Sequence, residues 1–429
     1  MGQLIITYKK KGEIMPFFRK KIYACAGFNT VSLGTGRKEF HPKKPRPGIE
    51  HYIKEAGLGA IGQIKNPENI DEGVIGNFIA ERFCKQGNLG AFFPIVHETF
   101  QYKPCTRVEG ACDSGGLALV VSIKTILADL ADVVLAIGVE VQNSVKAVYG
   151  ADYLAAADWY SGNRKNGHAY FFPDQFSQRA GACFEKFGKE KVRAGMAQWY
   201  VNAIENARKY PKAQEYHNTN PDLYATAMTP PNPKAFCEHI NVFDCSKVSD
   251  GGSAMIFASE EGLKKIGVEK KDAVEVISYG QVQDNLTTPP PDLTKNKTCE
   301  IAAKYAYERA GIKQKDLSVL DVHDCFTIAG ILAVEAAGLA GYGEGADFVK
   351  DGNTKADGII PTNTTGGLIG YGHPTGASGV RQAVDVVHQI SGKVGDCQVN
   401  ISPDKPFGMM SSMGGNDKTV VAMIFRKVE

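Results

Sequence analysis

The sequence predicts an α/β protein in which two similar halves are built around a central β-sheet. Apolar segments of strand length alternate with helical segments along the chain, which is typical of sheets covered by helices. The pattern of the first half returns in the second half, which indicates an internal repeat. At 429 residues the chain also exceeds the usual size of one hydrophobic core, so we expect two or three domains.

The first half is expected to open with a buried strand, followed by a glycine- and proline-rich loop and a helix. Residues 133–139 form a continuous apolar run, which is typical of a strand buried on both faces. The other elements expected here are strands at 21–28, 71–78 and 252–259 and helices at 48–56 and after residue 112.

The second half repeats these elements. Segment 274–282 corresponds to the opening strand, 307–312 corresponds to 53–58, and 316–326 corresponds to 69–78. The remaining elements are a helix after the glycine-rich segment 370–379, with apolar residues at the spacing of one helical face (Val380, Ala383, Val384 and Val387), and a closing strand at 419–425.

Residues 150–241 interrupt the repeat. They are aromatic and polar and include Trp159, Phe171 and Trp199, and they predict an inserted, mostly helical segment. The expected divisions are an N-terminal extension at 1–19, a first half at 20–149 plus 242–272, the insertion at 150–241 and a second half at 273–429.

Composition excludes several classes of function. Lys and Arg number 49 against 47 Asp and Glu, so a net charge of +2 gives no reason to expect nucleic acid or an anionic membrane as partner. No apolar run approaches the length of a membrane span. The 10 cysteines are scattered without paired spacing, which fits reduced thiols in the cytoplasm. The Lys-Lys-Gly-Glu run before Met15 is consistent with a translated ribosome-binding region and a true start at Met15.

Cys112 is the strongest candidate nucleophile, because it lies where a short turn meets the start of an apolar helix. Asp113 or Ser114 is expected to accept hydrogen bonds from the first turn of that helix. The helix dipole would bias the thiol toward the thiolate that attacks carbonyl groups. A packing cysteine before a core helix is the alternative.

Two motifs are interpreted as decoys. Residues 57–62 match G-x-G-x-x-G, but they follow a helix instead of a strand, so a dinucleotide site is not expected. Cys237, His239 and Cys245 lie close in sequence, but they lack the second ligand pair of a structural zinc site.

Three further segments supply what a catalytic thiol needs. His323 and Cys325 lie at a predicted strand end, and His373 lies in a glycine turn that opens a helix. Residues 411–416 form a glycine turn suited to presenting backbone amides. Together with the segment around Cys112, the repeat contains four such glycine-flanked segments. This favours an active site over isolated packing residues.

These motifs resemble the thiolase superfamily, and within it the sterol-carrier-protein-2 type. The matching segments, in order, are Ala-Cys-Asp-Ser-Gly-Gly at 111–116, Ser-Asp-Gly-Gly at 249–252, His-Asp-Cys-Phe at 323–326 and Gly-His-Pro-Thr-Gly-Ala-Ser-Gly at 372–379. The resemblance covers residues from about 20 to 426. It implies a five-layered αβαβα fold from two pseudo-repeated halves, with an inserted loop domain that binds CoA.

The resemblance also implies catalytic roles. Cys112 would be the nucleophile that takes up the acyl group, and His373 would be the base that activates it. His323 would form an oxyanion hole together with His373, and Cys325 would be the second acid/base.

The C-terminal glycine turn departs from most of the family. Most thiolases have a second cysteine in a Cys-x-Gly turn, whereas the matching position here is Ser412. The amides of Cys112 and Gly414 would form the other oxyanion hole, with Gly415 as the alternative to Gly414. Ser246 matches a loop-domain serine near the pantetheine of CoA.

The implied activity is CoA-dependent, reversible cleavage of a 3-ketoacyl-CoA, with acetoacetyl-CoA one candidate, through an acyl-cysteine. The alternatives are a condensing enzyme of the ketoacyl synthase or hydroxymethylglutaryl-CoA synthase kind, a Cys-His hydrolase, and a non-catalytic acyl-CoA-binding subunit. No permanently bound cofactor or metal is expected, because CoA enters as a substrate. The expected assembly is a homodimer or homotetramer, and some relatives work with a small zinc-containing partner protein.

Overall fold

The computed structural model describes residues 9–10, 13–14, 17–164 and 167–428. The predicted start at Met15 lies outside the described residues, as does most of the extension at 1–19. Among the described residues, no helix combines the length and the apolar composition needed to cross a membrane.

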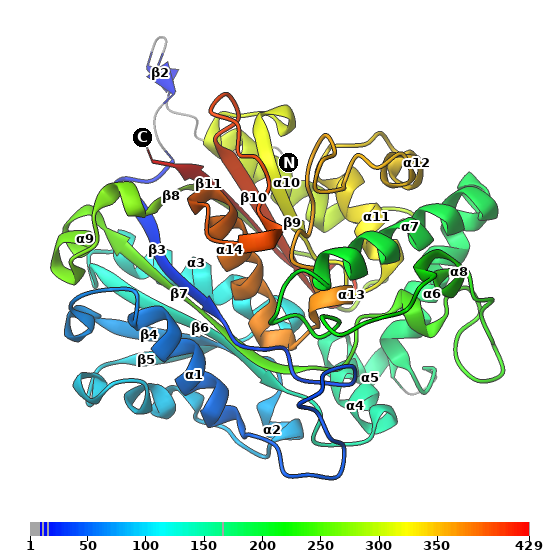
Figure 1. Cartoon of the computed structure of the whole chain (residues 1–429), viewed down its shortest axis with the longest axis horizontal. Coiled ribbons are helices and arrows are strands. Elements are labelled where there is room, and N and C mark those ends of the chain that lie inside the picture. Colours follow the sequence, from blue (N-terminus) through cyan, green and yellow to red (C-terminus); the bar gives the residue numbers. More distant parts are fainter. Residues whose placement is uncertain (1–8, 11–12, 15–16, 165–166, 429) are drawn as a thin grey trace.

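A 9-stranded mixed sheet forms the centre of the molecule, in the order β5-β4-β6-β7-β3-β8-β11-β10-β9 (Figure 1). The strands are β3 (Ile22–Asn29), β4 (Glu72–Gly76), β5 (Cys105–Val108), β6 (Val133–Val141), β7 (Asp250–Ser259), β8 (Val274–Gln283), β9 (Leu317–Val322), β10 (Phe407–Gly414) and β11 (Thr419–Lys427). A separate hairpin pairs β1 (Lys9–Lys10) with β2 (Glu13–Ile14).

The two halves of the sheet share one topology, which confirms the predicted repeat. In the first half, β4 and β6 are parallel, and the pairs β6–β7 and β7–β3 are antiparallel. In the second half, β9 and β10 are parallel, and the pairs β10–β11 and β11–β8 are antiparallel. The halves meet where β3 and β8 pair over only three residues, Ile22 to Ala24. The first half therefore has one extra strand, β5, at its outer edge.

The two halves of the sheet form two layers, and helices lie between these layers and on their outer faces. This gives the predicted five layers. The middle layer consists of α3 (Ser114–Leu127) and α14 (Thr375–Ser391), and their apolar side chains form one core with the inner faces of both sheet halves. The outer layers are α1 (Ile49–Ile61) and α9 (Glu260–Ile266) on the first half, and α10 (Lys297–Ala310) and α11 (Thr327–Ala336) on the second. Both middle helices begin at glycine-rich segments. Because the two helices pack against each other, these segments lie close together although they are distant in sequence.

The segment between residues 150 and 241 is mostly helical, as predicted. Its helices are α4 (Ala147–Leu154), α5 (Tyr160–Asn163), α6 (Phe171–Phe187), α7 (Lys189–Ala207) and α8 (Leu223–Ala227). They lie at the opposite end of the molecule from α9 (Figure 1). α7 packs on α11, α12 (Gly345–Lys350) and α13 (Gly367–Tyr371), so the segment covers the second half of the chain.

Three sequence-based expectations about individual elements are wrong. The first helix continues to Ile61, so Gly57 and Gly59 lie within the helix and only Gly62 ends it. Side chains at Gly57 and Gly59 would clash with Val96 and Phe28, so close packing explains these glycines. The predicted glycine turn at 411–416 is wrong for residues 411–414, because β10 contains serines and glycines and continues to Gly414, and β5 was not predicted because it is short.

Candidate active site

Cys112 lies in a single 3-10 turn, Ala111–Asp113, between the end of β5 and the start of α3. Ala111 has a φ of +56°, a left-handed conformation that costs a non-glycine residue on the order of 1–3 kcal/mol. The Ser114 hydroxyl accepts a hydrogen bond from the Gly110 amide (3.0 Å) and donates to the Ala111 carbonyl (2.7 Å), which fixes the turn. Cys112 as a whole residue is only partly buried, but its sulfur is enclosed by the groups around the turn.

The predicted capping of α3 is wrong. The Asp113 side chain makes no cap hydrogen bond, and Ser114 bonds backward to Gly110 instead of to the first turn. The extra 3-10 turn explains this, because it folds the Asp113 carboxyl back over Gly116, where any Cβ would clash with it. Burial raises the pKa of Asp113 well above its ordinary value, and the adjacent Ser412 hydroxyl only partly opposes the rise.

The predicted bias of Cys112 toward thiolate is also wrong for the resting protein. Burial raises the pKa of the Cys112 thiol to about 12, and the nearby Gly415 amide acts in the opposite direction but is outweighed. The sulfur is therefore protonated near neutral pH, and a base must remove this proton before the sulfur attacks a substrate.

His373 is placed to be that base. It follows α13, its amide donates to the Ser249 hydroxyl (3.0 Å), and its Nδ1 contacts the Ser378 hydroxyl at 2.7 Å. The Ser378 hydroxyl itself donates to the Pro374 carbonyl (3.1 Å), so we infer that Nδ1–H donates to Ser378 and Nε2 keeps its lone pair. Burial, aided by the positive charge of Arg381, lowers the pKa of His373 to about 3, so the ring is neutral.

His323 lies beside His373 at the end of β9. The two ring centroids are 5.0 Å apart and the rings are nearly perpendicular. Burial, followed by the proximity of His373, lowers the pKa of His323 well below its ordinary value. The Cys112 Sγ and one ring nitrogen of each histidine all lie within 4.8 Å of one another. The structure thus brings together three predicted site residues from three separate segments.

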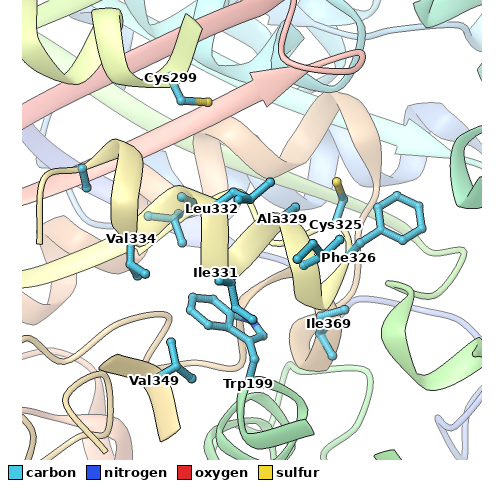
Figure 2. Packing of buried hydrophobic residues seen from close by; sticks show 14 of the residues in the cluster. Trp199, Cys299, Cys325, Phe326, Ala329, Ile331, Leu332, Val334, Val349 and Ile369 are labelled. Atoms are coloured by element: carbon cyan, nitrogen blue, oxygen red, sulfur yellow. The ribbon is translucent and has the colours of Figure 1, made fainter. Parts of the chain in front are cut away.

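Cys325 lies next to this group, in the short segment between β9 and α11. It belongs to the hydrophobic cluster that contains Phe326 and Trp199, and its sulfur points away from Trp199 (Figure 2). Burial raises the pKa of the Cys325 thiol well above its ordinary value, and the next contribution comes from the neighbouring Cys112. Its carbonyl accepts a hydrogen bond from the Ser246 amide (2.9 Å), which places Ser246 beside the same residues.

The C-terminal turn places the two candidate amide donors differently. Gly414 ends β10 and packs against the Gly110 carbonyl, where a side chain would clash. Gly415 has a φ of +67°, and its amide lies close to the Cys112 sulfur. The structure therefore favours Gly415, the alternative donor, over Gly414 as the amide that faces the Cys112 sulfur.

Two buried acids that organise the site were missed in the sequence. Glu140, at the end of β6, accepts hydrogen bonds from the Phe78 amide (2.9 Å), the Thr375 hydroxyl (2.9 Å) and the Gly376 amide (3.2 Å). Asp324 accepts from the Trp199 indole (2.9 Å) and the Leu368 amide (2.6 Å). Glu140 could have been noticed as the single acid in the apolar strand 133–141. An unpaired charge is rarely buried, so such an acid indicates hydrogen-bonding partners elsewhere in the fold.

Replacing Glu140 by glutamine is expected to lower the free energy of unfolding by about 2 kcal/mol, because an amide group would face donors that need an acceptor. Glu140 is fully buried, and it joins the end of β6 to the loop after β4 and the start of α14. Urea unfolding followed by circular dichroism measures the effect. The matched control is Glu98→Gln on the exposed surface, and equal stability of the two variants would contradict the assigned role.

The resemblance to thiolases implies acyl transfer at Cys112, and replacing Ser378 by alanine is expected to lower its rate about 10- to 100-fold, because Nδ1 of His373 loses the partner that fixes its tautomer. Rapid-quench measurement of the first turnover reads this step. Ser122→Ala, which removes a similar buried hydroxyl within α3, is the control. An unchanged rate in Ser378→Ala would remove Ser378 from the positioning of His373.

Comparisons with known proteins agree with this fold. A family model described as "Thiolase C-terminal domain-like" matches residues 280–427. An acetyl-CoA acetyltransferase of Methanothermobacter thermautotrophicus is 32% identical over 377 residues, covering 87% of this chain and 94% of the relative. Human sterol carrier protein 2 is 25% identical over 412 residues, covering 91% of this chain and 71% of the relative.

Solved structures show the same architecture. Human mitochondrial 3-ketoacyl-CoA thiolase in complex with CoA superposes with a TM-score of 0.68 at 18% identity, covering 96% of this chain and 98% of that chain. The structure of an "Ltp2-ChsH2(DUF35) aldolase" superposes with a TM-score of 0.75 at 19% identity, covering 95% and 98%. Fold and relatives together define an acyltransferase of α/β architecture. The chain belongs to the thiolase family.

Proposed function

We propose that this protein is a CoA-dependent thiolase that reversibly cleaves a 3-ketoacyl-CoA, such as acetoacetyl-CoA, into acetyl-CoA and a shortened acyl-CoA. The observation that supports this most is the approach of the Cys112 sulfur and two imidazole nitrogens to within 4.8 Å of one another. This arrangement joins a nucleophile, a base and a hydrogen-bond donor in one small site.

The first step forms the acyl-enzyme. His373 Nε2 removes the Cys112 proton as the sulfur attacks the 3-keto carbon, and the resulting oxyanion is held by the amides of Cys112 and Gly415. The bond between C2 and C3 then breaks, which leaves the acyl group on Cys112 and releases the enolate of acetyl-CoA. Amide donors of this kind contribute roughly 3 kcal/mol each in comparable acyl-transfer sites.

The second acid/base completes the first half-reaction. The enolate oxygen would be held by His323 and His373, and the Cys325 thiol would give its proton to C2 to form acetyl-CoA. The raised pKa of the Cys325 thiol keeps that proton in place until the enolate forms. In the second half-reaction a CoA thiol gives its proton to the Cys325 thiolate and attacks the acyl-cysteine. The bond between the acyl group and Cys112 breaks, and Cys112 takes back the proton held by His373, so the kinetics are ping-pong.

The inserted segment at 150–241 and Ser246 form the proposed CoA-binding side of the site. Ser246 is partly exposed, and its amide donates to the Cys325 carbonyl, so it lies beside the proposed second acid/base, which supports a place for it on this side of the site. We also propose that the enzyme is a homo-oligomer. We further propose that it works with a small partner protein, because the name of one structural neighbour, Ltp2-ChsH2(DUF35) aldolase, includes a DUF35 protein. Light scattering of the purified protein tests the oligomer.

A spectrophotometric assay of acetoacetyl-CoA cleavage with CoA tests the activity, followed by a series of longer 3-ketoacyl-CoA substrates. Turnover of one of them with ping-pong kinetics is expected. The alternative of a binding subunit, which the serine at position 412 suggests, predicts CoA binding without turnover of any substrate in the series. The alternative of a decarboxylating synthase predicts turnover of malonyl thioesters instead.

A further inference from the structure

The group formed by Cys112, His323 and His373 has the composition of a metal site as well as that of a catalytic site. Across the described part of the chain, it is the only cluster of three such side chains whose ligand atoms converge within 4.8 Å. Its donors are one sulfur and two imidazole nitrogens, without a carboxylate. Such donors select zinc and similar soft or borderline cations over magnesium or calcium.

Both histidines carry a ring nitrogen that is free to bind a metal, and His373 is also held by a second hydrogen-bonding partner. Within the described residues, His373 Nε2 and His323 Nδ1 are buried and have no hydrogen-bond partner. His373 is oriented by the contact of its other nitrogen with Ser378 at 2.7 Å. In metal sites, the ring nitrogen that does not bind the metal usually donates a hydrogen bond, and this fixes the tautomer and orientation of the imidazole.

The spacing is close to that of a tetrahedral site. Zinc–sulfur and zinc–nitrogen bond lengths place neighbouring ligand atoms about 3.3–3.6 Å apart. The three atoms lie within 4.8 Å of one another, so metal binding requires them to approach by up to about 1.5 Å. Three protein ligands leave a fourth position for water or for a thiol.

We propose that Cys112, His323 and His373 bind one Zn²⁺ ion, and that the metal and the acyl group compete for the Cys112 sulfur. Binding replaces the S–H bond of Cys112 by a sulfur–zinc bond and releases one proton to solvent. Zinc would therefore act as a reversible inhibitor and not as a cofactor. The inhibition rests on the proposed function, whereas metal binding does not.

Titration with Co²⁺, a spectroscopic substitute for Zn²⁺, tests the binding. We expect one equivalent to bind with a thiolate-to-cobalt charge-transfer band and to be displaced by Zn²⁺. Cys112→Ser is expected to lose that band, and His323→Ala is expected to weaken binding at least about 10-fold. Cys84→Ser removes a partly exposed thiol outside the group and is expected to bind like the parent protein.

Failure of a variant to fold does not prevent the test. In the unsubstituted protein, alkylation of Cys112 by iodoacetamide, mapped by mass spectrometry, is expected to abolish the cobalt band. A band that persists after alkylation of Cys112 or in a folded Cys112→Ser variant overturns the proposed site, and so does the absence of binding by the parent protein.

The inhibition is measured separately. Zn²⁺ at one equivalent is expected to stop acetoacetyl-CoA cleavage, and a chelator is expected to restore it. Full activity with the site occupied would overturn the competition. A protein that binds Co²⁺ through Cys112 but cleaves no 3-ketoacyl-CoA would overturn the proposed function and leave the metal site intact.

Discussion

Replacing Cys112 by alanine is expected to lower the rate of 3-ketoacyl-CoA cleavage by at least about 10⁴-fold, because the acyl group would have no carrier. The sulfur is within 4.8 Å of a ring nitrogen of both histidines, and the strained turn at Ala111 holds it there. Steady-state cleavage of acetoacetyl-CoA, with the products separated by chromatography, measures the loss.

The Cys112→Ala variant is expected to keep its fold, because the turn is held by the hydrogen bonds of Ser114, which do not involve the thiol. Its melting temperature checks this. Cys25→Ala, which removes a buried thiol from β3, is the matched control and should retain activity. A residual rate within about 10-fold of the parent rate would show that another residue carries the acyl group.

Replacing Cys325 by alanine is expected to lower condensation and complete cleavage by about 10²- to 10⁴-fold, the usual contribution of a general acid or base. Acylation of Cys112 by acetyl-CoA should remain measurable, because His373 and the amide donors are unchanged. The two half-reactions are separated by exchange of labelled CoA into acetyl-CoA on one side and by acetoacetyl-CoA formation on the other.

Equal losses in both half-reactions would contradict a separate role for Cys325 and would indicate a packing role instead. The position makes this control necessary, because Cys325 lies in the cluster with Phe326 and Trp199 (Figure 2). Cys325→Ser keeps the size of the side chain but not the acidity of the thiol. It should therefore show the same selective loss of condensation.

Much of the fold could be predicted from the sequence, because its buried strands are long apolar runs. The run at 133–139 is β6, extended to Val141, and the repeat places β8 and β9 correctly. Strand β10 could not be recognised, because it contains serines and glycines next to the candidate site, and glycine in particular has a low strand propensity. The length of α1 was underestimated, because glycines that permit close packing resemble helix ends in sequence.

The residues of the candidate site could be predicted, but their chemical states could not. The motifs identify Cys112, His323 and His373, and the fold brings them together. Sequence alone cannot show that burial overrides the helix dipole at Cys112, because this depends on everything packed around the sulfur. The preference for Gly415 over Gly414 also depends on a backbone direction that only the folded turn defines.

The positioning residues were the hardest to predict. Ser378 lies within a recognised motif, yet its role depends on the contact with His373 Nδ1 across one helical turn. Glu140 acts through bonds to residues 62 and 235 positions away in the sequence. Such long-range contacts leave no local pattern, so the supporting residues of a site are less visible in sequence than its reactive residues.

The most direct test of the account is to trap the covalent intermediate. The protein is mixed with acetyl-CoA, quenched with acid and digested, and the acetylated peptide is identified by mass spectrometry. The account predicts one acetyl group, on Cys112, that is lost when free CoA is added before the quench. Acetylation of another residue, or product formation without any acetyl-cysteine, would contradict it.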